Sequence, residues 1–160
     1  SRYIGSAKMP VMFLNGTNDF AYPMDSYAKT CELVQSEKNY SIQLRMKHGH
    51  IFDFQEFFLF VDQYIRKGTP MPLVARPIVK EGRVSATVKS STKLLSADLH
   101  YTSGLHEQNG KRSWTTVPLI VDGQQIHGAA PPHDATVWYI DVRDERKAVT
   151  SSEVMLTRDR

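Results

Sequence analysis

Residues 9–26 read MPVMFLNGTNDFAYPMDS, and the order of residue types in this stretch decides the class of fold that we expect. The run from Val11 to Leu14 is continuously apolar. Such a run is typical of a short strand that is buried on both faces of a parallel sheet. Asn15 and Gly16 follow it and favour a turn. The stretch therefore predicts a buried strand that ends just before a polar loop.

The same order of elements then repeats along the chain. Residues 24–35 place apolar side chains at helical spacing, and residues 40–46 alternate between apolar and polar as a strand does. Residues 54–66 return to helical spacing. Strand, helix, strand, helix is the repeating unit of an α/β sheet with helical crossovers.

The sequence changes character near residue 70. The stretch Gly68-Thr69-Pro70-Met71-Pro72 is typical of a linker, and the chain after it contains short alternating segments separated by turn residues such as Asn109-Gly110. We expect an α/β domain at residues 1–70, a linker at 71–77 and a small all-β sandwich of immunoglobulin or fibronectin type at 78–160. The expected strands of this second part lie near residues 84–88, 94–101, 114–121, 125–129, 137–142 and 153–157.

Polar residues follow both expected strands of the first part. Asp19 comes after the first strand, and His48-Gly49-His50 comes after the second. Functional groups of α/β sheets gather at the carboxyl ends of the strands. A carboxylate that orients an imidazole is the acid–base pair of a serine hydrolase, and the order Asp then His is that of α/β-hydrolases.

Three stretches together resemble the acetyl-xylan-esterase and dienelactone-hydrolase group of bacterial α/β-hydrolases. They are residues 9–26, residues 45–54 with the sequence RMKHGHIFDF, and residues 60–72 with the sequence FVDQYIRKGTPMP. Residues 114–132 and 138–153 are similar to the β-sandwich appended to some of these proteins. The resemblance implies that this chain is the C-terminal part of an α/β-hydrolase followed by that sandwich.

The resemblance also implies roles for particular residues. Asp19 matches the triad acid, and His50 matches the base because Gly49 precedes it, with His48 as the alternative base. No G-x-S-x-G motif occurs in the chain, so the serine nucleophile is expected in a hydrolase segment upstream of residue 1. The chain alone is then expected to be inactive.

Two functions from different classes follow. In the first, the chain is a fragment of a serine esterase whose substrate is an ester or an acetylated carbohydrate. The whole protein is then expected to be bacterial and to be located in the periplasm or secreted. The alternative is a non-catalytic β-sandwich module that binds carbohydrate or protein, attached to a hydrolase remnant. Trp114 and Trp138 leave both open, because a single sequence does not separate a buried tryptophan from one that binds sugar, although a place in the core is favoured.

The composition excludes other classes. Apolar residues make up 41% and charged residues 23%, and the net charge of +3 is spread along the chain, so nucleic-acid binding is not expected. Cys31 is the only cysteine, and the two histidines beside Gly49 lack a third ligand at a recognised spacing, so neither a metal nor another cofactor is expected. No apolar run is long enough to span a membrane.

Overall fold

The structure is a computed structural model that describes residues 3–49, 53–103 and 109–157. Its first part follows the expected order of strand, helix, strand, helix. A short 3₁₀ helix, η1 (Ile4–Ser6), precedes β1 (Val11–Asn18), α1 (Met24–Leu33), β2 (Lys38–Lys47) and α2 (Gln55–Ile65). The periodicity of the sequence therefore predicted these four elements correctly, although β1 extends four residues past the apolar run.

The second part is built from short strands. They are β3 (Leu73–Val74), β4 (Ile78–Lys80), β5 (Arg83–Lys89), β6 (Leu94–Thr102), β7 (Thr115–Asp122), β8 (Gln125–Ala129), β9 (Val137–Asp144), β10 (Val149–Ser151) and β11 (Met155–Leu156), with a 3₁₀ helix, η2 (Asn109–Lys111), before β7. Five of the six expected strands are present, and the sixth is reduced to the two residues of β11. The sequence did not predict β3, β4 or β10, which are two or three residues long and too short to show a period of two.

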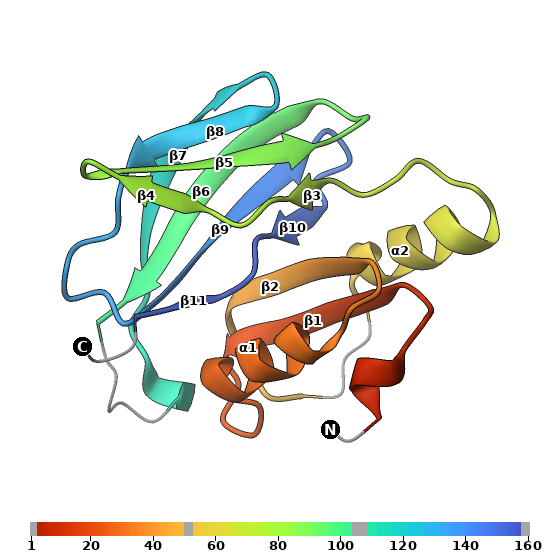
Figure 1. Cartoon of the computed structure of the whole chain (residues 1–160), viewed down its shortest axis with the longest axis horizontal. Coiled ribbons are helices and arrows are strands. Elements are labelled where there is room, and N and C mark those ends of the chain that lie inside the picture. Colours follow the sequence, from red (N-terminus) through yellow and green to blue (C-terminus); the bar gives the residue numbers. More distant parts are fainter. Residues whose placement is uncertain (1–2, 50–52, 104–108, 158–160) are drawn as a thin grey trace.

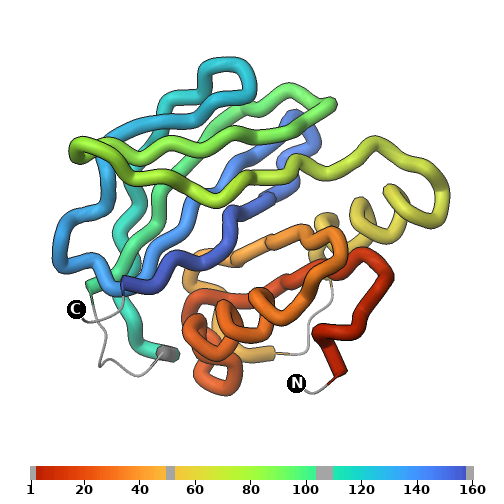
Figure 2. The backbone as a smooth tube through the Cα atoms, viewed as in Figure 1, coloured from red at the N-terminus to blue at the C-terminus, as the bar shows by residue number. Residues whose placement is uncertain are grey.

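All these strands belong to one curled sheet (Figure 1). Its order is β1-β2-β10-β9-β6-β7-β8-β5-β3, with β11 paired to β9 and β4 paired to β5. Strands β1 and β2 are parallel, and the other pairs are antiparallel. The far end of the sheet curls back so that β3 lies next to β10, and the tube trace shows how closely the two segments approach (Figure 2).

The expected fold class, part of an α/β-hydrolase sheet followed by a separate sandwich, is wrong. The edge of β2 is not part of a larger parallel sheet flanked by helices, because β10 pairs with it antiparallel at Ser151 and Tyr40. The Ile42 amide also donates a hydrogen bond to Ser151 Oγ at 2.9 Å. Nor does the second part separate into two sheets, since β7 pairs with β6 through its first half and with β8 through its second half. The described chain is thus a mostly β protein with two α-helices.

Two apolar clusters form the core. One fills the inside of the curl, where alternate residues of β5, β6, β8 and β9 meet, and it contains Trp138. The other joins the two parts of the chain, because Met24 and Ile42 pack there with Trp114 and Tyr139. Both tryptophans are buried, which confirms that they are core residues. Burial of this kind stabilises a fold by roughly 25 cal/mol per Å² of apolar surface.

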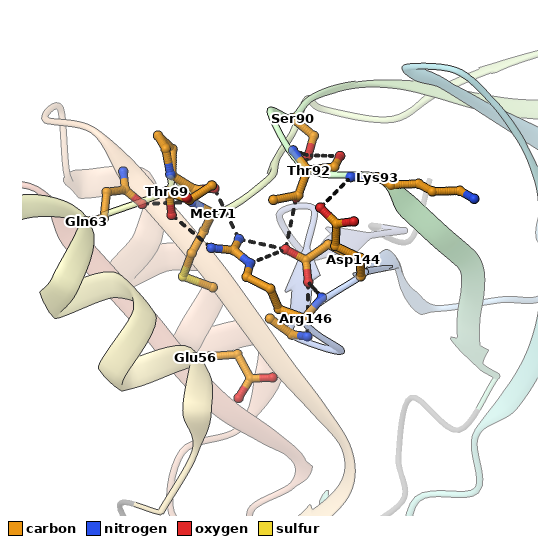
Figure 3. A network of polar contacts seen from close by, with 12 residues as sticks. Glu56, Gln63, Thr69, Met71, Ser90, Thr92, Lys93, Asp144 and Arg146 are labelled. Carbon is orange, nitrogen blue, oxygen red and sulfur yellow. Dashed lines mark hydrogen bonds and ion pairs between the residues drawn. The ribbon is translucent and has the colours of Figure 1, made fainter. Parts of the chain in front are cut away.

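Polar contacts also connect the two parts. The Arg146 guanidinium donates hydrogen bonds to the carbonyl oxygens of Thr69 and Pro70 at 2.9 and 3.1 Å, and it forms an ion pair with Asp144 (Figure 3). The segment at 71–77 that was expected to be a linker contains β3 and the buried Met71. The proposed domain boundaries stay a prediction, and the contacts here indicate that the two parts pack against one another.

Candidate functional site

A bulge where β1 and β2 end builds the site. The two strands pair in step from Val11 and Lys38 to Gly16 and Gln43, and the register then shifts so that Asn18 pairs with Lys47. Two extra residues of β2 are therefore accommodated over two steps of β1. Bulges redirect the side chains that follow them and occur often beside functional sites. In this chain the bulge turns the end of β2 toward the loop after β1.

Gly16 makes the bulge possible. A Cβ atom at this position would lie 2.3 Å from the Met46 carbonyl oxygen and 2.8 Å from its carbonyl carbon. Real Cβ atoms do not approach backbone atoms so closely, so a larger residue would push the strands apart. The glycine that was interpreted as a turn signal is thus required within β1 for close contact with β2.

Arg45 lies at the centre of the bulge in an unusual backbone conformation. Its φ angle is 58°, in the left-handed region that residues other than glycine rarely adopt. Its amide donates a hydrogen bond to Thr17 Oγ1 at 2.7 Å, and its Nη2 donates to the Trp114 carbonyl oxygen at 2.8 Å. Arg45 is therefore held at both its backbone and its side chain.

Asp19 and His48 meet at the ends of the two strands. His48 Nδ1 lies 3.0 Å from Oδ2 and 3.1 Å from Oδ1 of Asp19. The Asp19 carboxylate also accepts hydrogen bonds from the amides of Ala21 and Tyr22, at 2.7 and 3.0 Å. Because an ionised carboxylate only accepts hydrogen bonds, Nδ1 is the protonated nitrogen of the imidazole.

These contacts decide the charge state of Asp19. Burial acts to raise the pKa of this carboxyl, but the hydrogen bonds from the Tyr22 amide, His48 and the Ala21 amide outweigh it and hold the pKa below its ordinary value of 3.8. Asp19 is consequently a fixed negative charge at neutral pH, although only 6% of the residue is exposed.

The structure brings two of the three predicted site residues together. Asp19 and His48 are in contact, whereas His50 lies outside the described residues. The choice between the two histidines and the catalytic roles drawn from the sequence stay predictions, since a carboxylate beside an imidazole does not by itself define a reaction.

Two aromatic rings that the sequence reasoning missed stand beside this pair. The ring centroids of Phe20 and Tyr22 lie 5.1 and 5.8 Å from that of His48. Phe20 is 71% exposed and Tyr22 is 63% exposed. The two aromatic residues that follow Asp19 were visible in the sequence as a signal, because turns between strand and helix are usually polar.

A pocket of about 920 Å³ opens beside the pair. Asn15, Asp19, Tyr22, Arg45, Lys47 and His48 form its polar wall. The opposite wall is apolar and includes Phe54, Phe57, Phe60 and Val61 at and within α2. The combination of an apolar wall with a few convergent polar groups is the usual form of a site for a small molecule.

Two features are absent from the residues that the structure describes. Across residues 3–49, 53–103 and 109–157, no group of three His, Cys, Asp or Glu side chains is placed to hold a metal ion. In the same ranges, neither α-helix is long and apolar enough to cross a membrane.

Comparisons with known proteins give no family for the chain. No protein-family model matches it, and no curated protein matches it. Among solved structures, a carbohydrate-binding module of family 56, a β-1,3-glucan binding domain, covers 56% of this chain and 100% of its own, with 13% identity and a TM-score of 0.34. Pectate lyase Pel3 from Pectobacterium carotovorum covers 53% of this chain and 26% of its own, with 9% identity and a TM-score of 0.34.

The observed fold corrects the resemblance to α/β-hydrolases and the esterase activity expected from it. The described residues form one curled, mostly β sheet rather than a hydrolase sheet flanked by helices. The alternative drawn from the sequence, a non-catalytic β-sandwich module that binds carbohydrate or protein, does not depend on a hydrolase sheet, although the single curled sheet is not a two-sheet sandwich.

Proposed function

We propose that this chain is a carbohydrate-binding module and that its ligand occupies the pocket beside Asp19 and His48. The observation that carries the proposal is the exposure of Tyr22, which lines the pocket, and of the neighbouring Phe20 beside a buried, ionised carboxylate. Large exposed aromatic side chains in a group mark interaction surfaces. A buried charge that is held in place is a costly feature, and such groups gather at functional sites.

The chemistry of a sugar matches both kinds of group. One face of a pyranose ring presents C–H groups with partial positive charge, and these pack on the negative face of an aromatic ring. The hydroxyl groups at the ring edge donate to carboxylates and exchange hydrogen bonds with amides. Tyr22 offers such a ring, Asp19 offers a fixed acceptor, and Asn15 lines the same wall of the pocket.

The size of the pocket agrees with a ligand of a few sugar units. Its volume of about 920 Å³ is at the upper end of the range for sites that take small molecules. The apolar wall at and within α2 excludes water from one side, which strengthens the hydrogen bonds formed on the other side.

Affinity electrophoresis and calorimetry against a panel of soluble polysaccharides test the proposal. β-1,3-Glucan, the ligand named for the carbohydrate-binding module above, belongs in the panel together with an acidic polymer such as polygalacturonate. We expect at least one polysaccharide to bind, and we expect Tyr22→Ala to weaken that binding by about 10-fold, the factor that corresponds to about 1.4 kcal/mol.

Phe58→Ala is the matched control. Phe58 is 59% exposed, a fraction similar to the 63% of Tyr22. It is not among the residues that line the pocket. We expect this variant to bind as the wild type does. The proposal fails if the wild-type chain binds no polysaccharide of the panel, or if Phe58→Ala weakens binding as much as Tyr22→Ala.

A carbohydrate ligand also bears on location. The polysaccharides of cell walls lie outside the cytoplasm, so we propose that the protein acts in the periplasm or after secretion, as the sequence led us to expect. Fractionation of cells that produce the natural protein, followed by detection with an antibody, tests this location directly.

A further inference from the structure

We infer that the pocket takes an anionic saccharide, such as a uronate, and that Arg45 is the residue that selects it. The inference rests on the proposed function, because it names the class of sugar for the same site. Among the residues that the structure describes, three charged residues other than histidine line the pocket, and two of them, Arg45 and Lys47, are cationic. The third, Asp19, already pairs with His48.

Arg45 has a backbone conformation that is unfavourable for its residue type. A φ of 58° is strained for any side chain with a Cβ atom, and glycine would adopt it freely. Strained conformations persist where the surroundings fix them, and they gather at functional sites. Here the Thr17 hydroxyl and the Trp114 carbonyl oxygen fix the residue, and Arg45 also lines the pocket.

The hydrogen bond to Trp114 also prepares Arg45 for a ligand. A guanidinium carries five N–H donors in one plane, and the bond from Nη2 orients this plane before any ligand arrives. A planar donor set of this kind matches a carboxylate with two parallel hydrogen bonds, which a flexible ammonium group does not reproduce. The exposed Lys47 adds a second positive charge to the same wall.

Different residues of the pocket are expected to contact the sugar ring and its carboxylate. The C–H face of a uronate is the same as that of a neutral sugar, so Tyr22 is expected to contact either. Only the carboxylate distinguishes a uronate from the neutral sugar of the same ring configuration, and Arg45 and Lys47 are the pocket residues that respond to it.

Calorimetry of the full chain with polygalacturonate and with its neutral, methyl-esterified form, at about 20 and 200 mM NaCl, tests the inference. We expect tighter binding of polygalacturonate, and a loss of that preference at the higher salt concentration because salt screens exposed charges. Arg45→Gly removes the guanidinium and accommodates the φ angle, so the variant is expected to fold. It should bind polygalacturonate at least about 10-fold more weakly and should lose clearly more affinity for polygalacturonate than for the neutral polymer.

Lys147→Gly is the matched control, because Lys147 also has a left-handed φ, of 66°, but does not line the pocket. Its binding should equal that of the wild type, and Arg45→Lys should fall between the wild type and Arg45→Gly. Equal affinity for the neutral and acidic polymers, or an equal loss in Lys147→Gly, overturns the inference and leaves the proposed function standing. If neither polymer nor any other polysaccharide binds, the proposed function itself fails, and the inference fails with it.

Discussion

His48 Nδ1 lies within 3.1 Å of both carboxylate oxygens of Asp19, although the two residues are 29 positions apart in the sequence. The contact exists because Gly16 lets β1 and β2 approach and because the bulge at Arg45 turns the end of β2. Two local features of the backbone thus produce the central polar contact of the pocket.

The lowered pKa of Asp19 predicts how acid affects stability. Since the folded state favours the ionised form, Asp19 stabilises the fold fully above the ordinary pKa of 3.8, and this contribution is lost as the pH falls below that value toward the lowered folded pKa. We expect Asp19→Asn to reduce the free energy of unfolding by about 1–3 kcal/mol at pH 7, because the bonds to a charged acceptor are weakened.

Urea unfolding of the wild type and Asp19→Asn at pH 7, 5 and 3 measures this effect. Other carboxyl groups titrate in both proteins and cancel in the difference between them. The difference should therefore be largest at pH 7 and should narrow at pH 3. If the difference in free energy of unfolding between the two proteins stays constant over this pH range, the charge of Asp19 contributes nothing to stability.

Gly16→Ala tests the bulge. The added methyl group would lie 2.3 Å from the Met46 carbonyl oxygen, and backbone atoms cannot move aside as the end of a flexible side chain can. We expect a loss of about 3 kcal/mol in the free energy of unfolding, measured by chemical denaturation. Gly49→Ala is the control, because a Cβ atom there meets nothing within 4 Å, and its stability should be close to that of the wild type.

Asp98→Asn is expected to stabilise the protein at neutral pH. Asp98 and Asp141 are cross-strand partners on β6 and β9, and burial together with Asp141 raises the pKa of Asp98 above 3.8. Like charges directly opposite each other cost about 0.2–1 kcal/mol. Because the folded pKa is raised, the cost is present above that pKa and absent below 3.8, where both states are protonated. Thermal unfolding should show a higher melting temperature for Asp98→Asn than for the wild type at pH 7, and this difference should disappear at pH 3.

The sequence predicted the elements of the first part because their patterns are long and regular. The alternation through residues 40–46 and the helical spacing in residues 54–66 depend only on local burial, which periodicity records. The same patterns do not record which edges of strands pair. The pairing of Ser151 with Tyr40, which joins the two parts into one sheet, connects residues 111 positions apart and leaves no local trace.

The candidate site was predictable only in part for a similar reason. Asp19 and His48 follow expected strands, so their meeting could be inferred from the rule that polar groups gather at strand ends. Arg45 could not be singled out, because it fits the alternation of a strand between Leu44 and Met46, and a sequence does not show a positive φ at a residue other than glycine. The predicted fold class was wrong because the resemblance rested on short motifs at the ends of strands. Such motifs do not determine how the rest of the sheet is built.

Glu56 gives the sharpest test of how the two parts of the chain depend on one another. This residue lies in the first turn of α2, is 4% exposed, and its Oε1 accepts a hydrogen bond of 2.8 Å from the Val149 amide at the start of β10. Glu56→Ala leaves that buried amide without its acceptor, which costs about 1–3 kcal/mol. Glu56→Gln keeps an acceptor oxygen at the same place, so its free energy of unfolding should fall by less.

The number of unfolding transitions in these variants distinguishes two descriptions of the chain. Because Met24 and Ile42 share a core with Trp114 and Tyr139, we expect one cooperative transition that shifts to lower denaturant concentration in Glu56→Ala. Hydrogen exchange should show the loss of protection in both α2 and β10. Two separate transitions, with only one shifted, would instead favour the independent domains at residues 1–70 and 78–160 that the sequence suggested.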